Sequence, residues 1–174
     1  MCLCATLYYI WHMKLLLAMR HAKSSWDEPN LDDFDRPLNS RGERDAPKMG
    51  KRIAKKGIHV DHICSSPANR AISTAKLMAE AIDYPLKKIQ KEQALYHAGE
   101  DSILKIISSL PDTAERVLLV GHNPGLTDFV NNFPGTSIEN IPTAGLVVIE
   151  FDIKEWKSAT WKNGKVVHVD SPKK

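Results

Sequence analysis

The sequence has few cysteines, little net charge and no long run of like charges, and these absences exclude several classes of protein. Three cysteines in 174 residues are too few and too scattered for a disulfide framework. The formal net charge is +3, and no basic run is long enough to form a nucleic-acid-binding arm. We therefore expect a globular protein, with no nucleic acid among its partners.

A metal centre is also not expected. Cys2 and Cys4 are close together, but no second ligand pair follows them at the spacing of a metal site. Cys64 stands alone in an apolar run, which is typical of a buried structural thiol. The sequence therefore predicts neither a metal nor another cofactor.

The first thirteen residues are apolar, but they lack the features of an export signal or a membrane span. The segment has no basic amino-terminal region and no A-x-A cleavage pattern. It is much shorter than the roughly 20 residues that a membrane span needs. We interpret residues 1–13 as an N-terminal extension, with Met13 as a candidate natural start, and residues 14–174 as a single domain. The expected compartment is the cytoplasm, with no membrane partner.

Short apolar runs alternate with segments of helical spacing along the chain. Residues 14–19 are continuously apolar, as in a strand buried on both faces. Pro47 would be costly inside the first helix, so its regular part is expected to start near Ala46. The expected strands are 14–19, 62–65, 88–93 at an edge, 116–120, 145–152 and one or two within 156–169, and the expected helices are 40–56, 66–82, 101–110 and one from Asn123-Pro124 to 132. This alternation predicts an α/β three-layer sandwich with a mainly parallel central sheet and helices on both faces.

Basic side chains follow three of the predicted strands. Arg20 and His21 come after 14–19, Arg70 lies at the start of the helix after 62–65, and His122 comes after 116–120. Ligands of open α/β sheets bind at the carboxyl ends of strands, so we expect these four residues to meet. Each alone is typical of a surface or capping residue, and the prediction depends on their combination.

These residue types suit phosphoryl chemistry. A guanidinium group grips phosphoryl oxygens two at a time, and a neutral imidazole is a competent nucleophile near neutral pH. We therefore predict that His21 is the nucleophile, that a phosphohistidine intermediate forms, and that water hydrolyses it. Four acidic residues of the loop after 14–19 are expected beside the site, without a catalytic role: Asp27, Glu28, Asp32 and Asp33.

The motifs around these residues resemble those of the histidine phosphatase superfamily, the phosphoglycerate-mutase-like group. The matching segments are Arg20-His21 after a strand, Ser65-Ser66-Pro67-x-x-Arg70-x-x-x-Thr74-Ala75, Val120-Gly121-His122-Asn123-Pro124, and Pro37-Leu38-Asn39-x-x-Gly42. The resemblance extends from Lys14 onward and implies a phosphoglycerate-mutase-like fold. It also implies His21 as nucleophile and Arg20, Arg70 and His122 as the phosphate-binding catalytic pocket.

Within the superfamily, the short chain is most similar to the SixA type, the phosphohistidine phosphatases. Residues 20–24 and the segment Leu95-Tyr96-x-Ala98 carry this similarity. Ala22 departs from the usual glycine and adds only a methyl group to the pocket.

A general acid is missing where larger members of the superfamily carry one. The matching segment is 93–98, and its nearest acids, Glu92, Glu100 and Asp101, lie in no clear motif. An alkoxide leaving group needs a proton delivered to it, whereas imidazole is far less basic. This absence favours phosphohistidine on a partner protein as substrate. A phosphomonoesterase acting on a small phosphorylated metabolite is the alternative, and a non-catalytic phosphate-binding module is a third possibility.

Overall fold

The computed structural model describes residues 13–173, and the strands among them form one six-stranded sheet. The strands are β1 (Met13–Arg20), β2 (His62–Ser65), β3 (Gln90–Lys91), β4 (Arg116–Gly121), β5 (Leu146–Asp152) and β6 (Gly164–Asp170). Their order across the sheet is β3-β2-β4-β1-β5-β6. Met13 belongs to β1, and the rest of the expected N-terminal extension lies outside the described residues.

The sheet is mixed, so the expectation of a mainly parallel sheet was wrong. The pairs β3–β2, β2–β4 and β4–β1 are parallel, but β5 runs antiparallel to β1 and β6 antiparallel to β5. The reason lies in α5 (Gly125–Asn131), which follows β4. Its seven residues rise only about 10 Å, about half the length of β4, and the loop after it stays at the carboxyl edge, where Ile141 contacts Arg20. The next strand therefore starts at the carboxyl edge.

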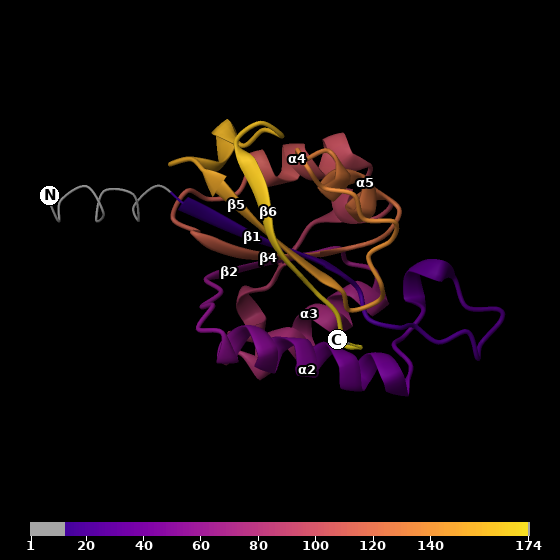
Figure 1. The fold of residues 1–174 in the computed structure, drawn as a ribbon. Coiled ribbons are helices and arrows are strands. Elements are labelled where there is room, and N and C mark those ends of the chain that lie inside the picture. Colours follow the sequence, from indigo (N-terminus) through magenta and orange to yellow (C-terminus); the bar gives the residue numbers. More distant parts are fainter. Residues whose placement is uncertain (1–12, 174) are drawn as a thin grey trace, which may run out of the picture.

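Helices lie on both faces of the sheet. Figure 1 shows α2 (Ser40–Lys55) and α3 (Asn69–Ala81) below the sheet, and α4 (Glu100–Ser108) and α5 above it. Alternate residues of β1 enter the two cores: Leu17 and Met19 pack on the α2/α3 side, whereas Leu16 and Ala18 pack in the other cluster. This burial on both faces explains the continuous apolar run of β1. Within residues 13–173, no helix has the length and apolarity required to cross a membrane.

Prolines and serines made the helix starts hard to predict. The first helix begins at Ser40, not near Ala46, with the Asn39 side chain accepting a hydrogen bond from the N–H of Gly42. Pro47 lies inside this helix, where it removes one backbone hydrogen bond, to the carbonyl of the exposed Glu43. Water can hydrate that carbonyl, so the helix continues through the proline.

The start of α3 and the length of the edge strand within 88–93 differ from the expectation, whereas the region 156–169 agrees with it. The helix α3 starts at Asn69 and not at Ser66, whose hydroxyl accepts a hydrogen bond from the N–H of Ala68 in the turn before the helix. The region 156–169 contributes one strand, β6, preceded by a short 3-10 helix, Trp156–Ser158. The edge strand expected within 88–93 is the two-residue β3.

The start of α5 packs directly against the segment before α4. An added Cβ at Gly125 would collide with the backbone carbonyl of Ala98, whereas one at Gly99 would meet no atom within 4 Å. A glycine at position 125 therefore allows the two segments to touch. Since both belong to the carboxyl edge of the sheet, this contact shapes the region where His122 lies.

We expect Gly125→Ala to lower the free energy of unfolding by about 2 kcal/mol, because overpacking against a backbone atom forces the chain to shift. Urea unfolding followed by circular dichroism measures the change. Gly99→Ala is the matched control and should change stability by less than about 0.5 kcal/mol. Equal effects of the two substitutions would contradict the close approach at Gly125.

Candidate active site

The structure brings the four predicted residues to one edge of the sheet. Arg20 ends β1, His21 follows it, Arg70 is the second residue of α3, and His122 follows β4. The N–H of His21 donates to the carbonyl of Gly121 at 3.0 Å, which ties the ends of the two strands together. The rings of His21 and His122 lie with their centroids 5.1 Å apart. The rule that ligand-binding residues follow strand ends therefore located this cluster.

One ring nitrogen of His21 is available to a ligand. Its Nδ1 lies 2.7 Å from the carbonyl oxygen of Ala22, and because a carbonyl only accepts, Nδ1 carries the hydrogen of the neutral ring. The lone pair is therefore on Nε2, which accepts a hydrogen bond from Nε of Arg70 at 3.2 Å. The N–H of Ala22 donates to Oγ1 of Thr74 and holds this turn in place. The geometry makes Nε2 the atom available for attack.

Both histidines are kept neutral. Burial lowers the pKa of His21 to about 4, although the hydrogen bond to Ala22 opposes this, and the charges of Arg70, Arg20 and Arg36 lower it further. Burial likewise lowers the pKa of His122 to about 3, helped by nearby cationic groups that include Arg70. At neutral pH each ring therefore keeps a lone pair on one nitrogen, which a nucleophile requires.

Unpartnered polar atoms gather at this edge. Among the described residues, the buried side-chain nitrogens and oxygens without a hydrogen-bond partner are Nε of Arg20, Nδ1 of His122 and Oδ1 of Asn123. The other end of Arg20 is held, since its Nη1 donates to the carbonyl of Ile141 at 2.8 Å. A buried polar atom without a partner is costly. Three of them together indicate where the polar groups of a ligand would bind.

Ser66 holds the second histidine. Its hydroxyl oxygen lies 2.8 Å from Nε2 of His122 and accepts a hydrogen bond from the N–H of Ala68. In the described part of the chain, Nε2 is the acceptor available to the buried Ser66 hydroxyl hydrogen. When Ser66 donates to Nε2, the neutral ring of His122 carries its hydrogen on Nδ1, the unpartnered atom. Sequence reasoning placed Ser66 at the start of the helix expected over 66–82 and missed this contact.

Asp33 is the second residue whose contact with the site was not predicted from the sequence. It was expected beside the site, and the structure places its carboxylate on Arg70, with Oδ2 accepting from Nη2 at 2.8 Å. The Asp33 backbone oxygen also accepts from Nη1 of Arg70. Partial burial would raise the pKa of Asp33, but Arg70, together with Tyr96 and Arg36, outweighs this effect and lowers it to about 2. The carboxylate is therefore ionised at neutral pH.

Arg36 fastens the loop that carries Asp33. Its Nη1 donates to Oδ1 of Asp33 at 3.0 Å, and its Nη2 donates to the hydroxyl of Ser24 at 2.7 Å. Its guanidinium also stacks on the ring of Trp26, 3.3 Å from the centroid. The loop between β1 and α2 projects at the carboxyl edge, on the right of Figure 1. No spacing in the sequence marks Arg36 as a third arginine of this region.

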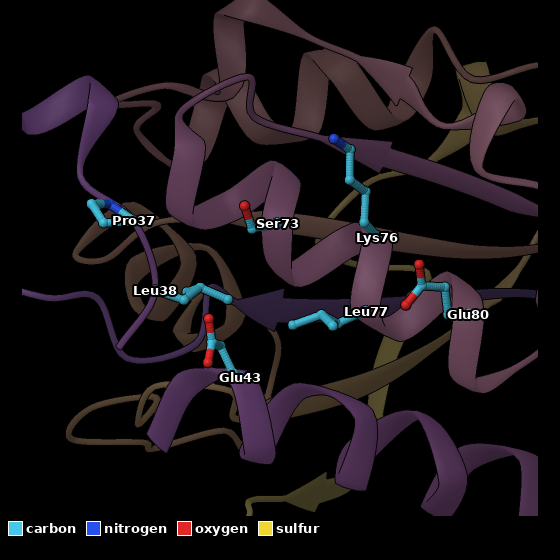
Figure 2. Close-up of a pocket in the computed structure, with 7 residues that line it drawn as sticks. All are labelled: Pro37, Leu38, Glu43, Ser73, Lys76, Leu77 and Glu80. Atoms are coloured by element: carbon cyan, nitrogen blue, oxygen red, sulfur yellow. The ribbon is translucent and has the colours of Figure 1, made fainter. Parts of the chain in front are cut away.

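Among the described residues, one hollow adjoins the cluster at His122 and another lies between α2 and α3. One of about 150 Å³ lies beside His122 and is lined also by His97, Asn123 and Asp128. Figure 2 shows the other, of about 370 Å³, between the start of α2 and the side of α3. Its lining mixes Leu38 and Leu77 with residues of both charges and includes neither His nor Arg. Its two carboxylates, Glu43 and Glu80, outnumber its one cation, Lys76, so this hollow does not favour an anion such as phosphate.

The chain is similar to known proteins over most of its length. The family model of the histidine phosphatase superfamily (branch 1) matches residues 16–98. An uncharacterized chloroplastic protein of Arabidopsis thaliana is 30% identical over 153 residues, which are 83% of this chain and 69% of that protein. An uncharacterized protein of Mycobacterium tuberculosis is 32% identical over 141 residues, which are 75% of this chain and 85% of that protein. The chain belongs to the histidine phosphatase superfamily.

Solved structures of the superfamily share the fold of this histidine phosphatase. The protein histidine phosphatase SixA, solved with tungstate, matches with a TM-score of 0.78 and 20% identity, covering 91% of this chain and 97% of that one. A structure described as the phosphohistidine phosphatase SixA of Agrobacterium tumefaciens matches with a TM-score of 0.76 and 26% identity, covering 91% and 98%. The SixA-type resemblance of the sequence therefore extends to the three-dimensional structure.

We expect Ser66→Ala to lower kcat/KM of the histidine phosphatase by roughly tenfold, because His122 then loses the contact that holds its ring and its tautomer. Steady-state kinetics on a phosphorylated substrate measures the change, and the ¹⁵N chemical shifts of the His122 ring report the tautomer. Ser65→Ala is the matched control, since the Ser65 hydroxyl is also buried but donates to the Ser66 carbonyl. An unchanged tautomer in Ser66→Ala would contradict the role of this hydroxyl.

Proposed function

We propose that this histidine phosphatase removes the phosphoryl group from phosphohistidine on a partner protein, with His21 as nucleophile. The observation that carries the proposal is the orientation of His21, whose Nδ1 hydrogen is bound by the Ala22 carbonyl, leaving the lone pair of Nε2 facing Arg70. An imidazole in this state attacks phosphorus without first losing a proton. The cytoplasmic location also stays a prediction.

The proposed reaction has two displacements at phosphorus. In the first, Nε2 of His21 bonds to phosphorus as the bond to the leaving nitrogen breaks. In the second, water attacks the phosphohistidine, inorganic phosphate leaves, and His21 regains its lone pair. Arg20, Arg70 and His122 would bind the equatorial oxygens, whose charge needs stabilisation in both steps. The free Nε of Arg20 and Nδ1 of His122 are donors suited to this task.

The lack of an acid within residues 93–98, where larger members carry one, supports a P–N substrate. Glu92, just before this segment, accepts a hydrogen bond from the N–H of Ala94. Burial, with Asp33 next in importance, raises the pKa of Tyr96, so that its hydroxyl stays protonated and is a weak acid. The carboxylate of Asp33 is ionised and has no proton to give. A leaving imidazole tolerates this lack better than an alkoxide does.

Hydrolysis of a small phosphate ester is the second candidate. A phosphoglycerate mutase of Candida albicans is 36% identical over 73 residues, which are 41% of this chain and 29% of that protein. That likeness favours a phosphorylated metabolite as substrate. Comparing turnover of a phosphohistidine protein with turnover of sugar phosphates separates the two candidates.

We expect His21→Ala to reduce turnover of a phosphohistidine protein by roughly 1000-fold or more, because the attacking atom is removed. The measurement is release of inorganic phosphate, together with mass spectrometry of the enzyme quenched during turnover, which should find the phosphoryl group on His21. His59→Ala is the control, since His59 is exposed and lies before β2. Retained activity in His21→Ala, or a phosphoryl group trapped on another residue, would refute the proposal.

We expect no loss of kcat/KM from protonation of His21 down to about pH 5, and a fall of roughly tenfold per unit below about pH 4. The reason is the lowered pKa of His21, whose ring takes up a proton only near pH 4 and cannot attack once protonated. A pH–rate profile with the phosphorylated substrate tests this, and a fall centred near 6.5 would contradict it.

The protein must be shown to be folded at each acid pH of that profile. The pKa of His21 is lower in the folded chain than in the unfolded chain. The unfolded chain therefore binds the proton first, and stability decreases as the pH falls from 6.5 towards about 4. Circular dichroism at each point separates unfolding from protonation of the nucleophile.

A further inference from the structure

The carboxylate of Asp33 lies on the solvent side of Arg70, the arginine that contacts the proposed nucleophile. Its Oδ2 accepts hydrogen bonds from Nη2 of Arg70 at 2.8 Å and from the hydroxyl of Tyr96 at 3.0 Å, and its Oδ1 accepts from Nη1 of Arg36 at 3.0 Å. The side chains of Arg70 and Arg36 are 7% and 8% exposed, whereas that of Asp33 is 45% exposed. The arginines therefore lie inside, and Asp33 lies towards solvent.

Arg70 joins this carboxylate to the nucleophile. Its Nε donates to Nε2 of His21, while Nη1 and Nη2 both donate to Asp33. Three of the five N–H groups of Arg70 already have acceptors, so a phosphoryl group that binds the remaining two shares the guanidinium with Asp33. The phosphoryl oxygens and the carboxylate are then neighbours on a single guanidinium group.

The leaving group must lie on the solvent side of this arrangement. A nucleophile and a leaving group stand roughly in line on opposite sides of phosphorus. His21 is only 8% exposed and would attack from the protein side, so the leaving group points towards solvent, the side on which Asp33 lies. A carboxylate there repels the phosphoryl oxygens and attracts a positive charge on the leaving group.

We propose that Asp33 determines the leaving group that this site accepts, favouring a phosphoryl group on a protonated imidazole over one on an ester oxygen. This proposal rests on the proposed function. In the first step, the P–N bond breaks as the bond from Nε2 of His21 to phosphorus forms. The electron pair of the P–N bond goes to the departing nitrogen, and the proton already on the other nitrogen leaves with the neutral imidazole. Atoms and charge balance without a general acid.

The test compares two small substrates that differ in their leaving group, phosphoimidazole and p-nitrophenyl phosphate. We expect Asp33→Asn to lower the ratio of their kcat/KM values, phosphoimidazole over ester, by about tenfold, because it removes the charge that attracts the cationic ring. Asparagine retains the shape and an oxygen acceptor for Arg70. Asp33→Glu retains the charge and should keep the ratio of the unmodified protein.

Asp35→Asn is the matched control. Asp35 is exposed, belongs to the same 3-10 helix (Asp33–Asp35), and its substitution changes the net charge by the same amount. The ratio should not change in this variant. An equal shift in Asp35→Asn would show a general effect of loop charge and overturn the proposal.

Two other outcomes would also overturn it. If Asp33→Asn lowers both activities equally, Asp33 has only a structural role, and if it raises both equally, Asp33 is a simple competitor of the phosphoryl group. An unmodified protein that hydrolyses neither substrate would refute the proposed function itself, and this inference with it. A cooperative thermal unfolding transition for each variant shows that the variant is folded.

Discussion

A buried guanidinium group donates to a buried imidazole only while that imidazole is neutral, and the arrangement of the site depends on this condition. Arg70 meets Nε2 of His21 because the Ala22 carbonyl holds the ring hydrogen at Nδ1. Burial lowers the pKa of His21 to about 4, so the condition holds at neutral pH. The same burial that brings positive charges close to the ring therefore preserves the lone pair that a nucleophile needs.

The antiparallel part of the sheet contributes to this site in addition to the parallel strands. The parallel pair β1–β4 places His21 and His122 side by side, as strand ends in α/β proteins commonly do. The short helix α5 then makes β5 start at the same edge, so the chain before it passes beside Arg20, where the Ile141 carbonyl receives Nη1. A fully parallel sheet would have begun β5 at the opposite edge, and that support would be missing.

The sequence predicted the elements whose signal is local and missed those that depend on tertiary contacts. The strand at 14–19 could be predicted because both faces of β1 are buried. The rule that ligands bind at the carboxyl ends of strands located the four basic residues. The direction of β5 could not be predicted from the sequence, because it depends on the edge of the sheet at which the chain lies after α5. Asp33 could not be told from Asp32, because only the folded loop places one of these carboxylates on Arg70.

The chemistry open to a carboxyl group depends on its neighbours more than on its presence near a site. Asp33 touches Arg70, Arg36 and Tyr96, and their effect lowers its pKa to about 2. A carboxylate held in this state cannot protonate a leaving group, so a search for acids by position alone would misjudge it. Its fixed negative charge still acts on any charge that the leaving group carries. The preference for a nitrogen leaving group would then follow from the charge of Asp33 on the solvent side of Arg70, a position that no motif in the sequence indicates.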